Sequence, residues 1–308
     1  VVSPNPENPE AMAMGIAKAR ETGAQLVLAS DPDADRIGLV VRDKQGNYQL
    51  VNGNQIVMIF LNYLMTRNTE LGTLTGNEYI VKTIVTTETI RTIAEAQHIK
   101  MYDCFTGFKW IANVMRENEG KARYLGGGEE SYGFLAEDFV RDKDSVSAIS
   151  LMAEIAAWAK DKGLNMTDML IDIYMKYGFS REKGISLVRK GKSGAEEIIA
   201  LMKQFRENPP KEIAGSPVVT VKDFQSLVET NVATGETKKL DMPATSNVLQ
   251  YYTADRTKVS VRPSGTEPKI KFYIEVHDTL ASADEYKATE ARADEKINRI
   301  AKEFGITK

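Results

Sequence analysis

The sequence has few cysteines that could form disulfides and no long apolar run that could anchor it in a membrane. One cysteine, Cys104, occurs among 308 residues, which excludes an internal disulfide framework and fits a reducing compartment. No apolar run approaches the roughly 18 residues that a membrane-spanning helix needs, and the chain opens without a signal-peptide pattern. These absences predict a cytoplasmic protein that has no membrane partner.

Neither sign of charge is in large excess. The formal net charge is −3, so no nucleic-acid partner is expected, although a local basic pocket stays open as a possibility. The two histidines, His98 and His277, stand in unrelated contexts and are interpreted as structural. The sequence does not indicate an oligomeric state.

Apolar spacing predicts alternating helices and strands in the first part of the chain. Asn8-Pro9 begins a helix that Gly23 ends, and buried strands at 25–29 and 37–41 flank an acidic loop. The other predicted elements here are helices at 53–66, 108–115 and 144–161, strands at 79–85 and 123–125, and helices capped by Thr86 or Thr87 and by Thr167. This alternation is typical of α/β domains.

The pattern changes near Tyr177-Gly178, after which strands cluster. They are predicted near 184–190, 217–221, 247–252, 256–261 and 269–276, with helices at 194–207 and at the end of the chain. The sequence therefore predicts multi-domain α/β architecture with mixed sheets, followed by a smaller α+β domain. The expected domains are 1–45, 46–180 and 181–308.

The acidic loop Asp31-Pro32-Asp33-Ala34-Asp35-Arg36 is the first candidate site. Three carboxylates brought this close repel one another unless a cation lies among them. Hard oxygen ligands in a short loop suit Mg²⁺. An EF-hand would need glycine and glutamate where Arg36 and Arg42 stand. The alternative is a solvated acidic turn.

Two further loops carry groups that suit a sugar phosphate. In Gly126-Gly127-Gly128-Glu129-Glu130-Ser131-Tyr132-Gly133, the glycines allow close approach to the backbone, while Glu129 and Ser131 offer groups for sugar hydroxyls. In the segment 262–268 (RPSGTEP), Arg262, two hydroxyls and a glycine suit an anion. Each also has a plain alternative, a mobile glycine turn for the first and a proline-glycine turn for the second.

Taken together, DPDADR, GGGEESYG and RPSGTEP, in that order and spacing, resemble the α-D-phosphohexomutase superfamily, which includes phosphoglucomutase and phosphomannomutase. The resemblance runs through nearly the whole chain. TGFKW, DKDSVSA and IYMKYGFSREK are especially similar to the branch with bacterial phosphoglucomutases and phosphopentomutase-like enzymes.

The resemblance implies four domains around a cleft and assigns roles to residues of this chain. Asp31, Asp33 and Asp35 would bind Mg²⁺, and Arg36 would lie near the transferred phosphoryl group. Lys109 matches a family lysine near the active site, although a surface lysine remains the alternative. The implied substrate-binding residues are Glu129, Ser131 and, as a looser match, Lys143 for the sugar end, and Arg262, Ser264, Gly265 and Thr266 for the non-reacting phosphate.

The family's phosphorylated serine lies in a Ser-His loop of the first domain, and this sequence contains no such loop. We therefore expect a C-terminal fragment without the phosphoserine domain, with residues 1–45 as the remainder of the second domain. In the intact protein, the resemblance implies that hexose 1-phosphate and hexose 6-phosphate interconvert through a phosphoserine and a hexose bisphosphate. The fragment is expected to be inactive alone.

Several alternatives stay open. Phosphomannomutase or phosphopentomutase activity would use the same loops, although Glu129-Glu130-Ser131 resembles loops of glucose-preferring members. A magnesium-dependent phosphatase of the haloacid dehalogenase type would want Thr or Val where Asp35 stands. A non-catalytic sugar-phosphate-binding module is the remaining alternative.

Overall fold

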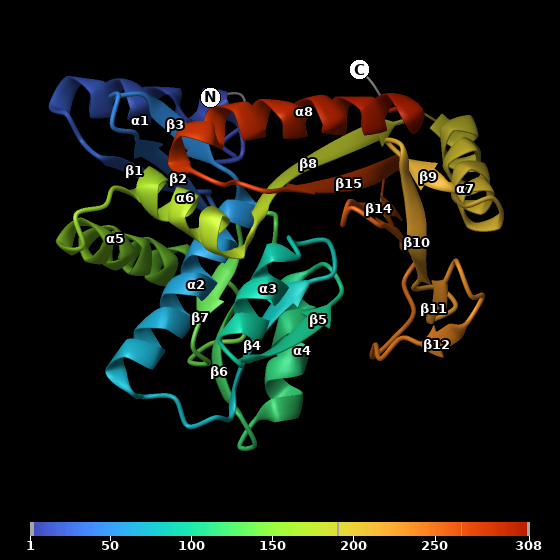
Figure 1. Cartoon of the computed structure of the whole chain (residues 1–308), viewed down its shortest axis with the longest axis horizontal. Helices are drawn as coiled ribbons and strands as arrows, with labels where there is room; N and C mark the ends of the chain where they lie inside the picture. Colours follow the sequence, from blue (N-terminus) through green and yellow to red (C-terminus); the bar gives the residue numbers. More distant parts are fainter. Residues whose placement is uncertain (1–2, 190, 266, 307–308) are drawn as a thin grey trace. The chain divides into compact units, whose positions relative to one another are not determined.

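The computed structural model describes residues 3–189, 191–265 and 267–306. The chain divides into two compact units, Val1–Tyr177 and Gly178–Lys308. Figure 1 shows the elements of both in sequence colours, and each unit is considered by itself.

The first unit opens with a helix and a small antiparallel sheet. Helix α1 (Pro9–Thr22) begins with proline in its first turn, and Gly23 ends it in the left-handed conformation at φ 72°. Strands β1 (Leu26–Ser30), β2 (Ile37–Arg42) and β3 (Tyr48–Val51) follow in the order β1-β2-β3. β2 is almost wholly buried, as predicted, whereas β1 is only half-buried and that part of the prediction is wrong.

A four-stranded sheet forms the second layer of this unit, in the order β5-β4-β6-β7. β4 (Glu78–Thr83) lies parallel to β5 (Lys100–Cys104) and β6 (Arg123–Gly128), and β7 (Phe134–Ala136) is antiparallel. The connecting helices are α2 (Gly53–Leu71), α3 (Thr89–Ala96) and α4 (Phe108–Asn118). The carboxyl ends of three parallel strands therefore meet at one edge, where α/β sheets commonly bind ligands.

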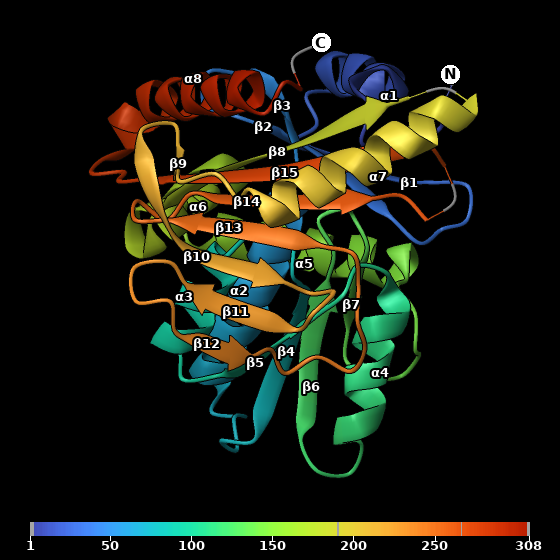
Figure 2. The same cartoon turned by 90° about the vertical axis from the view of Figure 1, so that its right-hand side faces the viewer.

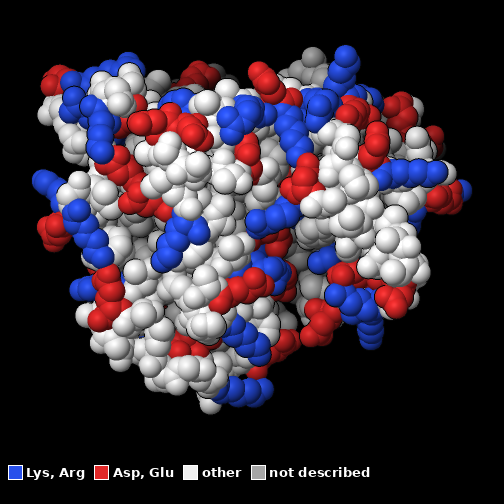
Figure 3. Space-filling model, viewed as in Figure 1, with Lys and Arg blue, Asp and Glu red and all other residues white. Residues whose placement is uncertain are grey.

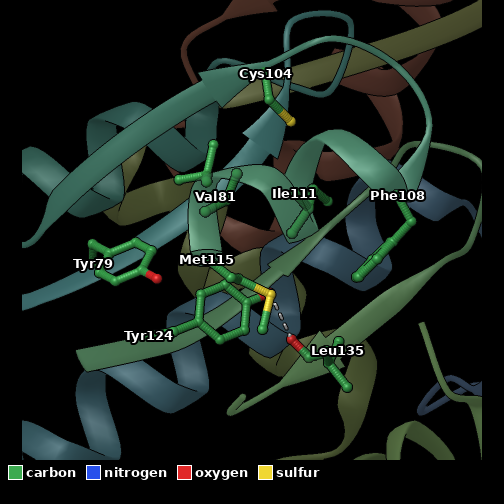
Figure 4. Close-up of a cluster of buried hydrophobic side chains, with 9 residues drawn as sticks. Tyr79, Val81, Cys104, Phe108, Ile111, Met115, Tyr124 and Leu135 are labelled. Carbon is green, nitrogen blue, oxygen red and sulfur yellow. Dashed lines mark hydrogen bonds between the residues drawn. The ribbon is translucent and has the colours of Figure 1, made fainter. Parts of the chain in front are cut away.

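The core between this sheet and α4 is apolar and aromatic (Figure 4). Tyr79 and Tyr124 pack with ring centroids 5.6 Å apart, and the Tyr124 hydroxyl donates to the Leu135 carbonyl at 3.2 Å. Cys104 lies in the same cluster, and burial raises the pKa of its thiol. These contacts pack the strands of the sheet against α4.

Helices α5 (Ser145–Asp161) and α6 (Met166–Tyr177) complete the first unit. The predicted cap of α5 is confirmed, because Asp144 accepts bonds from Val146 N at 3.1 Å and Ser147 N at 3.0 Å. Two other predicted caps are wrong. Thr167 lies inside α6, whose start is closed by Asn165 and Asp168 bonding each other's backbone N–H.

At α3 the N-cap is Glu88, which makes no side-chain cap, so neither Thr86 nor Thr87 fills that position. Their hydroxyls bond elsewhere. Thr87 Oγ1 accepts from Thr89 N at 3.3 Å, and Thr86 Oγ1 accepts from Glu130 N at 3.2 Å.

The second unit is built on a long antiparallel sheet, in the order β12-β11-β10-β13-β14-β15-β8 (Figure 2). Its strands are β8 (Phe179–Val188), β9 (Glu212–Ile213, which pairs with β10), β10 (Ser216–Asp223), β11 (Val228–Asn231), β12 (Thr237–Lys239), β13 (Leu249–Thr253), β14 (Lys258–Pro263) and β15 (Lys269–Asp278). Its helices are α7 (Gly191–Glu207), the short 3-10 helix η1 (Ala283–Glu285) and α8 (Tyr286–Glu303).

The two long helices pack on one face of this sheet. Phe272 of β15 meets Phe205 of α7 and Phe304 just after α8, with centroids 5.9 Å from each. Because side chains alternate along a strand, Lys269 and Lys271 project to the other face, where Lys271 pairs with Arg262 of β14. One face of the sheet is therefore apolar core, and the other carries cations at the end where Arg262, Lys269 and Lys271 lie.

The predicted fold class, mixed α/β followed by a smaller α+β part, is confirmed. Several short strands were missed, among them β3, β5, β7, β11 and β12. On the face drawn in Figure 3, acidic and basic side chains are interspersed. Within the described residues, no helix is both long and apolar enough to cross a membrane.

The cap of α5 gives a stability test. Asp144→Ala removes the acceptor for two backbone N–H groups and is expected to lower the free energy of unfolding by about 1 kcal/mol. Denaturant titration at pH 7 measures it. Asp161→Ala at the other end of α5 is the control and should be neutral or slightly stabilising, because an acid disfavours a helix C-terminus. Equal losses in both variants would refute the cap.

Candidate active site

The acidic loop joins β1 to β2, and Asp31 organises it from within. Asp31 Oδ1 accepts bonds from Asp35 N at 3.1 Å and Arg36 N at 3.0 Å, and Ala34 N donates to the Asp31 carbonyl at 3.1 Å. Ala34 has a left-handed backbone, with φ 56°. The Asp31 side chain is only 8% exposed, so one of its oxygens fixes the loop.

Two cations lie among the carboxylates of this loop. Arg36 Nε is 3.6 Å from Asp31 Oδ2 and 3.7 Å from Asp35 Oδ1, and Lys143 Nζ is 2.8 Å from Asp35 Oδ2. Arg36 Nη1 also lies 3.6 Å from Glu7. These two cations reduce the repulsion that three neighbouring acids would otherwise suffer.

The loop does not form a finished metal cage. Among the residues that the structure describes, no group of three or more His, Cys, Asp or Glu side chains is arranged to hold a metal ion. Asp33 is exposed. Asp35 Oδ1 is buried and has no hydrogen-bond partner in the described part of the chain. The donor oxygens are hard ligands of the kind that Mg²⁺ prefers, and their role as ligands stays a prediction.

The three glycines of the second loop lie within β6 rather than in a mobile turn. A Cβ at Gly127 would come within 2.7 Å of the Val81 carbonyl, and one at Gly128 within 2.7 Å of Val57 Cγ2. The glycines are therefore required by close packing against β4 and α2. The interpretation that they expose the backbone to a ligand is corrected, and the loop proper begins at Glu129.

Glu129 is buried at the carboxyl end of β6. Its Oε1 accepts from Gly107 N at 2.7 Å, and its backbone N–H donates to the Gly133 carbonyl at 2.9 Å. A Cβ at Gly133 would lie 2.4 Å from Lys143 Cδ and 3.2 Å from Glu129 Oε2. Because Gly133 has no side chain, the side chains of Glu129 and Lys143 can approach each other beside it.

Main-chain bonds join the acidic loop to the sheet and to α5. Ile37 N donates to the Tyr132 carbonyl at 3.1 Å, and Ser145 N donates to the Ala34 carbonyl at 3.0 Å. As a result, Asp35 comes close to Glu129 and Lys143, which lie more than 90 residues later in the sequence. Ser131 lies two residues beyond Glu129 and is half-buried.

The electrostatic environment shifts the pKa of two of these groups. Burial and the neighbouring charge of Glu130 raise the pKa of Glu129, although the bond from Gly107 and the charges of Lys143 and Arg36 act the other way. Burial opposes the charge of Lys143, but the carboxylates around it, Asp35 first among them, raise its pKa. Lys143 is therefore firmly cationic, whereas Glu129 is easier to protonate than an ordinary glutamate.

Lys109 is less closely tied to this group. It is exposed at the first turn of α4, with Nζ 5.5 Å from the centroid of the Trp110 ring. Gly107, two residues earlier, is the donor to Glu129. The catalytic role predicted for Lys109 stays a prediction.

The third loop connects β14 to β15 in the second unit. Ser264 N donates to the Lys269 carbonyl at 2.8 Å, Glu267 N donates to Ser264 Oγ at 3.3 Å, and Arg189 N donates to the Pro268 carbonyl at 2.9 Å. Gly265 is exposed. Thr266 lies outside the described residues.

Cations gather beside this loop. Arg262 is half-buried and lies opposite Lys271 on the neighbouring strand. Lys269 forms an ion pair with Glu267. The two lysines were not predicted, although their alternation, Lys269-Ile270-Lys271-Phe272, is a visible strand signal. Arg262, Lys269 and Lys271 make this end of the sheet suitable for an anion.

Comparison with known families covers most of the chain. Models of three consecutive phosphoglucomutase/phosphomannomutase domains match: domain II over residues 1–46, alpha/beta/alpha domain III over 52–177 and the C-terminal domain over 207–293. The chain belongs to the α-D-phosphohexomutase superfamily.

Relatives and solved structures agree with this membership. A phosphoglucomutase of Staphylococcus epidermidis is 36% identical over 274 residues, and one of Staphylococcus aureus is 35% identical over the same length; each match covers 89% of this chain and 49% of the relative. A phosphoglucomutase/phosphomannomutase family protein from Burkholderia thailandensis has the same fold, with TM-score 0.60 and 20% identity over 98% of this chain and 52% of that one. The chain therefore spans about half the length of the superfamily members it matches.

The pKa of Glu129 predicts an unusual pH dependence. Because its pKa is higher in the folded chain than in the unfolded chain, ionisation of Glu129 costs stability as the pH rises through the folded pKa. Glu129→Gln removes that cost and leaves an oxygen to accept from Gly107. The melting temperature of the variant, relative to the unsubstituted chain, is expected to rise between pH 4 and pH 7.

Glu78→Gln is a control with the opposite sign. Burial alone raises the pKa of Glu78, but bonds from Thr75 and Gly76 prevail and lower it. Its ionised form therefore stabilises the fold above the unfolded pKa, and this contribution is lost as the pH falls. Glu78→Gln should become relatively less stable toward pH 7. Parallel slopes for the two variants would contradict the assignment for Glu129.

Proposed function

We propose that this chain provides the metal, sugar and phosphate loops of a phosphoglucomutase-type enzyme, an isomerase of carbohydrate metabolism that works in the cytoplasm by intramolecular phosphotransfer. Hexose 1-phosphate and hexose 6-phosphate interconvert in the intact protein through a phosphoserine and a hexose bisphosphate. The observation that carries the proposal is the meeting of Asp35, Lys143 and Glu129 in one unit, within a chain that belongs to this superfamily.

In this proposal the first unit handles the reacting end of the sugar phosphate. Asp31, Asp33 and Asp35 would hold Mg²⁺, which would offset negative charge on the transferring phosphoryl group. Arg36 and Lys109 stand beside that group as cations. Glu129 and Ser131 bind sugar hydroxyls, and Lys143, which forms an ion pair with Asp35, also binds the substrate.

The second unit holds the other phosphate. Arg262 presents a planar fork of donors, and Ser264, Gly265 and Thr266 add hydroxyl and backbone donors. Such a site accepts a phosphate without regard to which carbon carries it. That property suits an enzyme whose bisphosphate intermediate must bind in two orientations.

Two other activities of the same class use the same groups, phosphomannomutase and phosphopentomutase. The likeness of Glu129-Glu130-Ser131 to glucose-preferring loops and the names of the Staphylococcus relatives favour glucose. Asp35, at the position where a haloacid dehalogenase-type phosphatase wants Thr or Val, argues against that class. A non-catalytic sugar-phosphate-binding module would bind the same ligands without turnover.

Arg262 provides the test of the phosphate site. In calorimetric titrations of the chain with glucose, mannose and ribose 1-phosphates, Arg262→Ala is expected to weaken binding by about tenfold or more, because a charge-assisted bidentate contact is lost. Binding of free glucose should not change. Arg292→Ala on α8 is the control, since it removes an exposed arginine paired with Asp278. Equal weakening of glucose and glucose 1-phosphate would refute the assignment.

The acidic loop provides a second test. Asp33→Ala removes an exposed carboxylate that makes no hydrogen bond within the described loop, so the fold should persist. Magnesium binding, measured by titration calorimetry without any sugar, is expected to be lost because too few hard ligands remain. Asp43→Ala, in the turn between β2 and β3, is the control. Unchanged magnesium binding by Asp33→Ala would remove the metal role from this loop.

A further inference from the structure

A fully buried lysine lies at the carboxyl end of β4. It is near the loop Glu129–Ser131, here called the sugar loop, but is not one of the residues assigned to sugar binding. Lys82 is 0% exposed. Its Nζ lies 3.0 Å from Glu88 Oε1 and 2.9 Å from Asp103 Oδ1. Arg91 meets the same two acids, with Nε 3.0 Å from Glu88 Oε2. The result is a quartet of two cations and two anions.

Such a quartet is a poor device for stability alone. Burying the Lys82 ammonium costs much of what its attraction to the two acids returns, and the ion pairs of Arg91, which is 39% exposed, are weakened by water. Buried ionic groups can instead enforce one particular arrangement of the chain. The question is therefore what this quartet holds in place.

Lys82 also fixes the turn that follows β4. Its Nζ donates to the carbonyl oxygens of Thr83 at 3.4 Å and Thr86 at 3.3 Å. The turn is closed by Thr86 N, which donates to the Thr83 carbonyl at 3.1 Å. One ammonium group thus joins two acids and two carbonyls, and the hydroxyls of both threonines are left to point elsewhere.

Those hydroxyls meet the sugar loop. Glu130 Oε2 accepts from Thr83 Oγ1 at 3.0 Å and from Thr86 Oγ1 at 3.3 Å, and Glu130 N donates to Thr86 Oγ1 at 3.2 Å. The two hydroxyls lie 2.8 Å apart. Both the side chain and the backbone of Glu130 are therefore held by the turn.

The start of α2 also packs closely against this loop. A Cβ at Gly53 would lie 2.0 Å from the Glu130 carbonyl oxygen, so glycine is needed for the helix to approach. Glu130 stands between Glu129 and Ser131, and fixing it fixes both neighbours. Thr83 is the last residue of β4, and Thr86 and Glu130 lie just beyond the carboxyl ends of β4 and β6, where small displacements would reach a bound ligand.

We propose that Thr83 and Thr86, held by buried Lys82, are positioning residues that set the geometry of the sugar-binding loop Glu129–Ser131. The structural part of this inference does not depend on the activity. Its consequence for sugar recognition rests on the proposed function. Two experiments separate the two parts.

The first experiment is amide hydrogen exchange of the ligand-free chain. Thr86→Val removes the acceptor of Glu130 N and one donor to Glu130 Oε2, so exchange over 129–133 should become faster by about tenfold, while the amides of β4 keep their rates. Thr167→Val is the matched control, because its buried hydroxyl has no hydrogen-bond partner among the described residues. Unchanged exchange over 129–133 in Thr86→Val would overturn the proposal.

Lys82→Met extends this experiment to the cation. It should speed exchange in the turn 83–86 as well as in the loop, because both carbonyl contacts are lost. Faster exchange in the turn with a wholly unchanged loop would overturn the link between Lys82 and the loop. If Lys82→Met does not fold, exchange over 129–133 in Thr86→Val decides the proposal by itself.

The second experiment is a double-mutant cycle on glucose 1-phosphate binding, measured by calorimetry. Thr86→Val and Ser131→Ala are each expected to weaken binding by about tenfold, and the double variant by much less than the product, because both act on one loop. A full product would overturn the positioning role. If exchange responds as expected but the unsubstituted chain binds no hexose phosphate, the proposed function fails and the positioning of the loop stands.

Discussion

The first unit depends on how the hairpin between β1 and β2 is held against the four-stranded sheet. Two backbone hydrogen bonds contribute, from Ser145 N of α5 to the Ala34 carbonyl and from Ile37 N to the carbonyl of Tyr132 in the loop between β6 and β7. Main-chain atoms make both of these bonds, and within the loop Asp31 Oδ1 adds two more by accepting from Asp35 N and Arg36 N. The Asp35–Lys143 ion pair and the approach of Lys143 to Glu129 follow from this attachment. Backbone hydrogen bonds bring the segments of the site together, and the side chains of Asp35, Lys143 and Glu129 supply its charges.

Much of this could be predicted from the sequence, because local signals determine it. Proline at the start of α1 and Asp144 before α5 mark helix ends through groups within a few residues. The class of fold follows from alternating helices and strands, and the superfamily follows from three loops in order. Those loops together carry groups suited to a metal ion, sugar hydroxyls and a phosphate, and few other families combine them in this order.

The remainder depends on contacts that no local pattern contains. The consecutive glycines 126–128 predict a backbone that a ligand can approach, but close packing against β4 and α2 places them inside a buried strand. Thr86 was expected to cap a helix, yet its hydroxyl is used by Glu130, 44 residues away. Lys82 gives no signal in the sequence, because a lone lysine in an apolar strand does not reveal that it will pair with Glu88 and Asp103, which Arg91 also contacts. Long-range pairing decides each of these, and one sequence does not reveal it.

Cys104 shows how the core affects what can be done with the protein. It lies among Tyr79, Tyr124 and the helix α4, and burial raises the pKa of its thiol, so the reactive thiolate is scarce at neutral pH. No other cysteine occurs in the sequence. Cys104 is therefore expected to react little with thiol-specific labelling reagents in the folded chain. A cysteine introduced at an exposed position in either unit would carry a fluorophore or spin label alone, without prior removal of Cys104 from the core.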